Sequence, residues 1–340
     1  MADAKPPLLF ATCPPGLEPV LEAELAEHGF RSRQRLPGGV QFRGSPLRAN
    51  RLLATAHRVL LPVARFEARD FDALVAGAEA VDWTPYGGLT PRVSAHKSRL
   101  FHTGAIAEWL GACVPAGEGS LYCRLMHDRC TLQVDTSGEH LHRRGWREET
   151  GPAPLRETLA AQILALAGWV PGMALVDPCC GSGTFVIEAA GQAAGLAPGR
   201  LRKFACERWW RTEVMPRRDA VPTVIRAGDR SRTALATARR NAERAGVEIE
   251  WVAGSASALT PPAETGLLVA NPPYGARIPG ASDAWDEIGA LLRGPFAGWK
   301  AAVLSPDRGL ERRLGREASE KIPMRNGGLR VDLLILEPSA

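Results

Sequence analysis

The sequence predicts an α/β protein: a doubly wound, Rossmann-like domain with a seven-stranded sheet, preceded by smaller α+β modules. Three observations support this. Apolar strand candidates alternate with helical segments from about Leu155 onward. The last two candidates are joined by an Asn-Gly turn. Before about residue 146, short strands and helices are mixed. A length of 340 residues favours two or three units over one ordinary domain.

In the N-terminal part, alternating and helical spacings define five elements. We predict strands over Leu8–Thr12, Gly39–Arg43 and Leu61–Phe66, and helices over Leu17–His28 and Leu47–Leu60.

In the C-terminal part, seven strand candidates follow one another with helices between the first five, notably over Gly183–Gln192 and Ser231–Ala245. The strands are expected at 174–178, 223–229, 249–255, 267–272, 301–305, 318–324 and 331–336. A parallel sheet that ends in an antiparallel hairpin is the layout of class I methyltransferases, and it differs from an ordinary dinucleotide-binding fold.

Arginine dominates the positive charge of the chain. The net charge is +5, and only five of the 42 basic residues are lysines. Between His28 and Phe66 there are eight arginines and no acidic residue, which favours a nucleic-acid surface because guanidinium groups bind phosphates and stack on bases. Biased composition with a solvated face explains this stretch about equally well. The predicted RNA contacts within it are Arg31, Arg33, Arg35 and Arg43.

Several classes of protein are disfavoured by the sequence. No apolar run approaches the ~20 residues of a membrane span, and the N-terminus does not resemble a signal peptide. The seven cysteines never occur as CxxC. His140 and His142 have no third ligand at suitable spacing, so we expect no metal. We therefore expect a cytoplasmic protein without membrane association, and a monomer.

A cofactor site is predicted after the first strand of the C-terminal domain. Gly181 and Gly183 allow a ligand to approach the backbone, and free N–H groups at the following helix suit the methionine carboxylate of S-adenosyl-L-methionine (SAM). A purely structural turn is the alternative, made less favoured by the preceding strand and Asp177. The predicted contacts in this segment are Asp177, Pro178, Cys180, Gly181, Ser182, Gly183 and Thr184.

The next two strands should complete the cofactor site. Asp229 ends the second strand, where an acid can bind both ribose hydroxyls, although a helix N-cap is an alternative role. Arg230 follows it. After the third strand, Ser255 and Ala256 occupy the place where such enzymes often hold the adenine with Asp, so the contact of Ser255 with the adenine amine is a hypothesis.

The segment Asn271-Pro272-Pro273-Tyr274 follows the buried fourth strand and is predicted to be catalytic. A base amine is a poor nucleophile because its lone pair is delocalised. The Asn271 side-chain oxygen and a main-chain carbonyl of the Pro-Pro pair can accept its two N–H groups and favour a pyramidal nitrogen. Proline fixes φ and thus the carbonyl direction, and Tyr274 can stack on an extruded base. This motif does not separate adenine, guanine, cytosine or a glutamine amide.

These residues together resemble the THUMP-domain class I RNA guanine-N2 methyltransferases, over essentially the whole chain. The segments that carry the likeness are 9–18, 135–147, 153–160, 197–199, 204–209 and 326–329. The resemblance implies a ferredoxin-like unit over 1–45, a THUMP RNA-binding unit over 46–145 and a methyltransferase domain over 146–340. Residues 90–130 look short for a THUMP unit, which puts the mode of RNA docking in question.

The resemblance also implies functions for particular residues. It carries SAM binding onto Asp177, Gly181, Gly183 and Asp229, and catalysis onto Asn271 and Tyr274. By the same matching, Pro154, Leu155 and Glu157 line the cofactor pocket. Arg143 and Arg144, in the junction between the domains, are expected to contact RNA.

The function expected is transfer of a methyl group from SAM to N2 of a guanosine in 23S rRNA or tRNA. Guanine rests on the resemblance alone. The alternatives are a DNA adenine-N6 or protein glutamine methyltransferase with the same motif, and a non-catalytic RNA-binding protein. The absence of a recognisable target-recognition domain disfavours DNA, and the intact glycine turn and Asn271 disfavour a non-catalytic protein.

Overall fold

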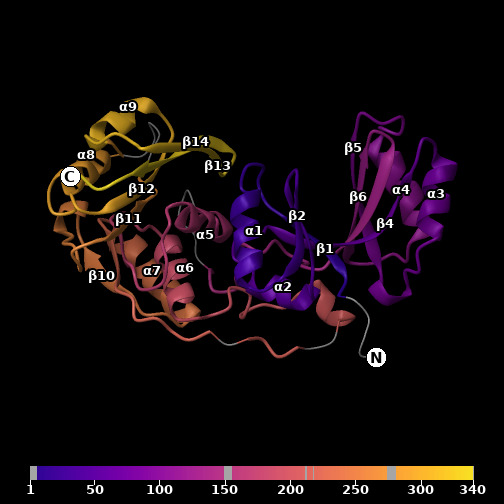
Figure 1. The fold of residues 1–340 in the computed structure, drawn as a ribbon, viewed down its shortest axis with the longest axis horizontal. Coiled ribbons are helices and arrows are strands. Elements are labelled where there is room, and N and C mark those ends of the chain that lie inside the picture. Colours follow the sequence, from indigo (N-terminus) through magenta and orange to yellow (C-terminus); the bar gives the residue numbers. More distant parts are fainter. Residues whose placement is uncertain (1–5, 149–154, 211–212, 217, 274–280, 340) are drawn as a thin grey trace. The chain divides into compact units, whose positions relative to one another are not determined.

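The computed structural model describes residues 6–148, 155–210, 213–216, 218–273 and 281–339 (Figure 1). The chain divides into two compact units: residues 1–141 with 202–215, and residues 142–201 with 216–340. No helix in the described part of the chain is long and apolar enough to cross a membrane.

The first unit contains one seven-stranded sheet of order β2-β3-β1-β4-β7-β6-β5, antiparallel except for β5 and β6. The sheet runs through residue 45, where we predicted a boundary, and the domain boundaries stay a prediction. Its strands are β1 (Leu8–Thr12), β2 (Arg31–Leu36), β3 (Gly39–Arg43), β4 (Arg58–Glu67), β5 (Leu89–His96), β6 (Gly119–Met126) and β7 (Arg129–Asp135). The helices are α1 (Glu18–Glu27), α2 (Pro46–Leu52), α3 (Phe71–Glu79) and α4 (Thr103–Cys113).

The predicted helix over Leu47–Leu60 is wrong beyond Leu52. Leu53 is extended, and the main-chain N–H groups of Ala54 and Thr55 donate to the Glu24 carboxylate of α1 at 2.6 and 3.1 Å. A contact with a residue distant in sequence therefore replaces the next helical turn. The chain then enters β4 at Arg58, three residues before the predicted strand.

The second unit contains the sheet that positions the site, of order β10-β9-β8-β11-β12-β14-β13. β14 runs antiparallel to both of its neighbours, β12 and β13, as the predicted terminal hairpin requires. The strands are β8 (Ala174–Asp177), β9 (Ile225–Asp229), β10 (Glu250–Ala253), β11 (Gly266–Ala270), β12 (Lys300–Ser305), β13 (Glu320–Asn326) and β14 (Leu329–Leu336). The helices are α5 (Glu157–Leu166), α6 (Thr184–Ala193), α7 (Arg232–Ala245), α8 (Ala281–Arg293) and α9 (Arg308–Glu311).

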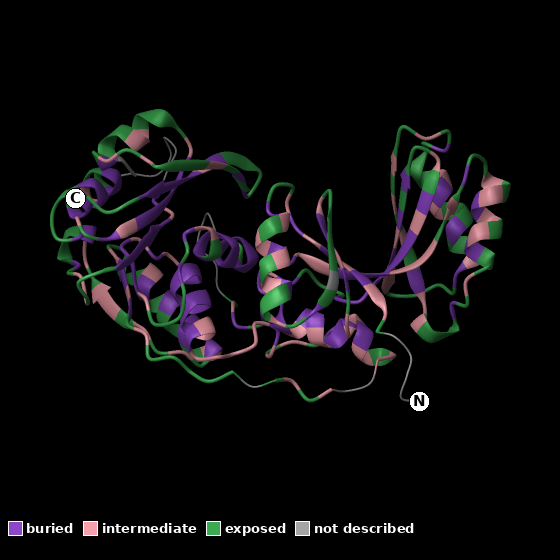
Figure 2. Ribbon diagram, in the orientation of Figure 1, coloured by how far each residue is buried: buried purple, intermediate pink, exposed green. Residues whose placement is uncertain are grey.

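The central strands of this sheet are buried on both faces, as parallel strands usually are. All five residues of β11 are buried, and the strands stand out as a buried layer in Figure 2. On one face, Val176 and Leu268 pack against Trp285, Ile288 and other residues of α8. The order of strands changes direction at β8, so the carboxyl edge of β8 and β11 is the expected ligand site.

Candidate functional site

The glycine turn and the Asn-Pro-Pro segment lie side by side because β8 and β11 are parallel neighbours. Val176 pairs with Leu268, so both strands end at the same edge of the sheet. A main-chain hydrogen bond from Asn271 also reaches the Cys179 thiol. Burial raises the pKa of this thiol well above its ordinary value, and the hydrogen bond opposes that shift. Cys179 therefore acts as a neutral packing residue between the two segments.

The turn after β8 has the backbone conformation that its glycines allow. Gly181 and Gly183 have φ of +54° and +87°, where a side chain is strained. A Cβ at Gly183 would come within 3.2 Å of Ile187 and of Ala238, so α6 and α7 approach closely here. A Cβ at Gly181 would meet nothing within 4 Å. Open space at Gly181 is what a ligand lying on the turn requires.

Asp229 joins the ends of β8 and β9. Its Oδ2 accepts the Gly181 N–H at 2.9 Å, and its Oδ1 accepts the Ser231 N–H at 2.8 Å. The N-cap of α7 is Ser231, whose hydroxyl accepts the Ala234 N–H. Asp229 is thus not itself the helix cap, and its half-buried carboxylate lies at the end of β9, where the ribose is expected.

Asp177 lies beneath the turn and is buried at 2% exposure. Its Oδ1 accepts the Cys179 N–H at 3.1 Å. Burial raises the pKa of Asp177 to about 8, and the negative charge of Asp229 adds to this shift. The hydrogen bond to Cys179 indicates that Asp177 stabilises the conformation of the turn.

The Asn271 side chain, directly after β11, carries a buried polar atom that has no partner among the described residues. Its Oδ1 is buried and accepts no hydrogen bond from any described residue. Buried acceptors are rarely left unsatisfied, so this oxygen is a candidate for a ligand donor. Pro272 is buried, and Tyr274 lies outside the described residues.

Trp285 of α8 fixes the second proline of this segment, which the sequence analysis missed. Its indole Nε1–H donates to the Pro273 carbonyl at 3.2 Å, and the ring is fully buried. The buried ring also packs in the core of the second unit. No local sequence pattern indicates this hydrogen bond, because Trp285 lies 12 residues after Pro273 along the chain.

A buried ion pair lies at the start of α5 and contacts the first residue of α6. Arg147 Nε lies 3.0 Å from Oε1 of Glu157, and its guanidinium also donates to the Thr184 hydroxyl. The pKa of Glu157 is raised by burial, which the charge of Arg147 partly offsets. Leu155 is buried beside this pair, with its carbonyl 3.5 Å from the Thr184 hydroxyl, and Pro154 lies outside the described residues. The Ser182 carbonyl accepts Nδ2 of Asn241 at 3.1 Å.

The end of β10 lies beside Asp229, because the Gly254 N–H donates to the Asp229 carbonyl at 3.2 Å, and Ser255 and Ala256 follow directly. The Ser255 hydroxyl pairs with the Ser257 hydroxyl at 2.6 Å. The sequence analysis missed Glu287 of α8, whose Oε2 accepts the Ala256 N–H at 2.9 Å and whose Oε1 lies 2.7 Å from Nη2 of Arg230.

The predicted RNA contacts differ in exposure. Arg31, Arg33, Arg35, Arg43 and Arg143 are exposed. Arg144 is a correction: its side chain is buried and forms two hydrogen bonds with Glu188, at 3.2 and 3.1 Å. A buried guanidinium held by a carboxylate cannot reach a phosphate, so Arg144 is structural.

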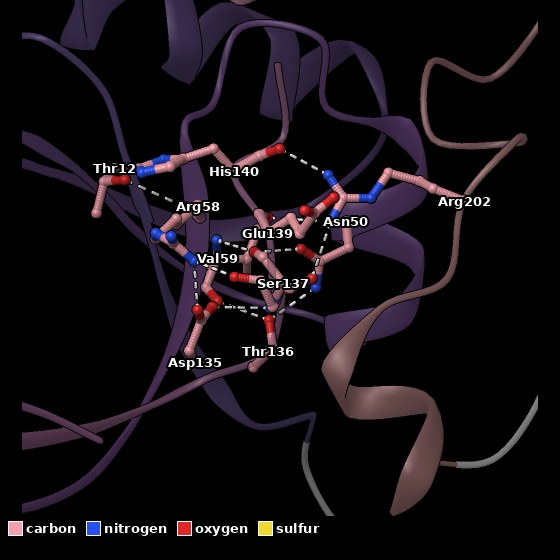
Figure 3. Close-up of polar contacts among 11 residues, drawn as sticks. Thr12, Asn50, Arg58, Val59, Asp135, Thr136, Ser137, Glu139, His140 and Arg202 are labelled. Atoms are coloured by element: carbon pink, nitrogen blue, oxygen red, sulfur yellow. Dashed lines mark hydrogen bonds and ion pairs between the residues drawn. The ribbon is translucent and has the colours of Figure 1, made fainter. Parts of the chain in front are cut away.

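The segment 135–140 is held by a dense set of hydrogen bonds within the first unit (Figure 3). The Ser137 hydroxyl donates to Oδ1 of Asn50 at 2.6 Å and accepts the Val59 N–H at 2.8 Å. Arg58 forms an ion pair with the buried Asp135. Arg202 donates to the main-chain carbonyls of this segment at 2.6 to 3.1 Å. The segment is therefore rigidly supported by side chains.

The residues of the second unit fit SAM. The open space at Gly181, the Asp229 carboxylate at the end of β9 and the unpartnered Asn271 oxygen lie along one sheet edge. The Gly181 turn and the Asp229 carboxylate would hold the cofactor, and the Asn271 oxygen would be available to the group that receives the methyl. Among the described residues, no three His, Cys, Asp or Glu side chains gather as a metal site requires.

Several known proteins are similar to this chain. The family model described as "RMKL-like, methyltransferase domain" matches residues 144–335, and an RlmL ferredoxin-like domain matches residues 8–60. "Putative RNA methyltransferase slr0064" of Synechocystis sp. is 32% identical over 96% of each chain. The crystal structure of SMU.472 complexed with SAH has a TM-score of 0.86 and 29% identity, covering 99% of this chain and 100% of that one.

Longer relatives match as well. The ribosomal RNA large subunit methyltransferase K/L of Psychromonas ingrahamii is 35% identical over 92% of this chain, but the match spans only 48% of that protein. The chain thus spans about half the length of the K/L relatives. These findings confirm SAM as the cofactor, the class I methyltransferase fold and the ferredoxin-like N-terminal domain, but they do not show a THUMP unit. The chain belongs to the RMKL-like family of SAM-dependent methyltransferases.

Proposed function

We propose that this protein methylates the exocyclic N2 amine of a guanosine in structured RNA, either large-subunit rRNA or tRNA. The single observation that carries amine methylation is the buried Asn271 oxygen at the end of β11, which accepts no hydrogen bond from the described part of the chain. RNA as the substrate is supported by the names of the slr0064 and K/L relatives and by the exposed arginines of the first unit.

The chain's own groups orient the acceptor. Asn271 Oδ1 accepts one N–H of the amine. The Pro273 carbonyl already accepts the Trp285 indole, so we assign the second N–H to the Pro272 carbonyl. Two acceptors at fixed positions favour a pyramidal nitrogen and stabilise the positive charge that develops on it. SAM, when bound, supplies the electrophilic methyl group on a sulfonium.

A base swung out of an RNA helix needs a surface on which to stack, and Tyr274 remains our candidate for that role. Exposed arginines of the first unit would bind phosphates without reading sequence. In this proposal the first unit positions the RNA, and the second unit selects and methylates the amine.

Labelled SAM and separate pools of tRNA, rRNA and DNA test the proposal. We expect label in RNA, released as N2-methylguanosine on nuclease digestion and mass spectrometry. Label in DNA alone would overturn the RNA assignment, and label on another RNA base would overturn guanine. No transfer to any pool would favour a non-catalytic RNA-binding protein. Mapping the nucleotide that lacks its methyl group in RNA from a knockout strain shows whether the natural substrate is rRNA or tRNA.

A further inference from the structure

Glu287 lies at the point of the cofactor site where the sequence lacks an acid. It belongs to α8, far along the chain from β9 and β10, yet its carboxylate bridges the loops that follow both strands. Its side chain is 26% exposed, so the group is neither fully buried nor freely solvated. A carboxylate held at the open edge of a ligand site is available for a donor on the ligand.

The other acceptors at this end of the site are already engaged. Both oxygens of Asp229 accept main-chain N–H groups, and the hydroxyls of Ser255 and Ser257 pair with each other. The ion pair with Arg230 holds the Glu287 carboxylate in place. Both Glu287 oxygens also have partners, but Oε2 accepts the Ala256 main-chain N–H, so Glu287 is the carboxylate that lies directly beside Ala256 among the described residues.

The pair formed by the Ala256 N–H and Glu287 Oε2, 2.9 Å apart, matches the edge of adenine. Adenine presents a donor, its 6-amino group, next to an acceptor, N1. Placed between the two groups, that edge would exchange one protein hydrogen bond for two: Ala256 N–H to N1, and the 6-amino group to Glu287. The apolar side chains of Val252 and Leu259 lie in the same cluster as Ala256 and offer the ring a dry surface.

We propose that Glu287 binds the 6-amino group of the SAM adenine while the Ala256 main-chain N–H binds N1. Glu287 thereby takes the place of the acid that is absent at Ser255. The proposal concerns cofactor binding only, so it stands or falls independently of whether the methyl acceptor is RNA, DNA or protein.

The test is a binding cycle measured by isothermal titration calorimetry on the full chain without any methyl acceptor. The ligands are SAH and its analogue with hydrogen in place of the 6-amino group. The variants are Glu287→Ala and Glu287→Gln. Asp286→Asn is the matched control, because Asp286 lies on the same helix but pairs with Arg313, 2.6 Å away.

We expect the unmodified protein to bind the analogue about tenfold or more weakly than SAH, since hydrogen bonds to charged groups are strong. Glu287→Ala should lose about the same factor for SAH and almost nothing for the analogue. Glu287→Gln, which keeps one acceptor and the side-chain shape, should lie between. Asp286→Asn should bind both ligands as the unmodified protein does.

Two outcomes overturn the proposal. Equal losses for both ligands in the Glu287 variants would show that the residue only supports the 255–258 loop. Unchanged SAH affinity in those variants would show that it does not contact the adenine. If Glu287→Ala fails to fold, as judged by circular dichroism, Glu287→Gln and the comparison of the two ligands on the unmodified protein still decide the matter.

Discussion

Asn271 is the residue on which the chemistry depends most directly. Asn271→Ala removes the side-chain acceptor but leaves the Gly181 turn and Asp229 intact. We expect transfer to fall by about 10²–10³-fold, the usual effect of deleting one group that stabilises developing charge. SAH affinity, measured by calorimetry, should be retained. Loss of SAH binding in this variant would instead place Asn271 in the cofactor site alone.

Trp285 allows the support of the motif to be separated from its chemistry. Trp285→Phe keeps an aromatic ring in the core and removes the donor to the Pro273 carbonyl. We expect kcat to fall several-fold with SAH affinity unchanged, because the Pro-Pro carbonyls lose a fixed direction. Trp299→Phe is a matched control, since that indole donates to the Ala263 carbonyl, away from the motif. A fall in kcat of the same size in both variants would indicate general softening of the core.

Asp177 should make folding stability depend on pH. Its pKa is raised from 3.8 to about 8 in the folded state. A raised carboxyl pKa means that the folded state favours the protonated form, so stability is highest below about pH 4 and is lost as pH rises toward 8. Asp177→Asn removes this dependence. Its stability relative to the unmodified protein, from urea unfolding, should increase between pH 4 and 8; a constant difference would contradict the assignment.

At the scale of elements, strand pairing in the first sheet places the predicted RNA-binding arginines of β2 and β3 on two different faces. A bulge in β2 shifts the register, so Arg31 pairs with Arg43, whereas Arg35 pairs with the buried Val40. Residues opposite each other across a sheet share a face, and Arg35 forms an ion pair with Glu22 of α1. Arg31 and Arg43 therefore lie together on the other face.

This arrangement predicts unequal effects on RNA binding. Neutralising Arg31 and Arg43 to glutamine should flatten the dependence of log Kd on log salt by about 1.4 to 1.8, if two phosphate contacts are lost. Arg35→Gln should change the slope less, because the charge of Arg35 is already paired with the Glu22 carboxylate. Filter binding across a salt series measures both. An unchanged slope in the double variant would mean that this stretch is a solvated face of biased composition and does not bind RNA.

The elements that sequence analysis located correctly are those with a strong local signal. The buried run of β11 and the terminal hairpin were predicted within one or two residues, because burial and turn chemistry are written in neighbouring residues. The end of α2 was not, since Glu24 of α1 determines it. For the same reason the prediction that Arg144 contacts RNA is wrong: its partner Glu188 is distant in sequence. Glu287 and Trp285 act through contacts that no local spacing reveals.

At the scale of the whole molecule, residues 202–215 belong to the first unit although the second unit surrounds them in sequence. Arg202 and Trp209 hold this segment, one through main-chain carbonyls of 137–140 and the other through Tyr86, with ring centroids 5.4 Å apart. Arg202→Ala should speed proteolysis within 202–215 several-fold and leave SAH affinity unchanged. Electrophoresis of timed trypsin digests, against Arg208→Ala with its exposed pair to Glu118, is the measurement. Equal rates in both variants would contradict an anchoring role.

The membership of 202–215 in the first unit also bears on synthesis at the ribosome. The first unit lacks its last segment until the 60 residues 142–201 have been translated. At ~5–20 residues per second, that delay is roughly 3 to 12 s. During this interval Arg202 cannot yet donate to the main-chain carbonyls of 137–140. Trp209 likewise cannot yet pack against the apolar cluster of the first unit. The nascent first unit therefore matures only after part of the catalytic unit exists, so the two cannot be completed in strict succession.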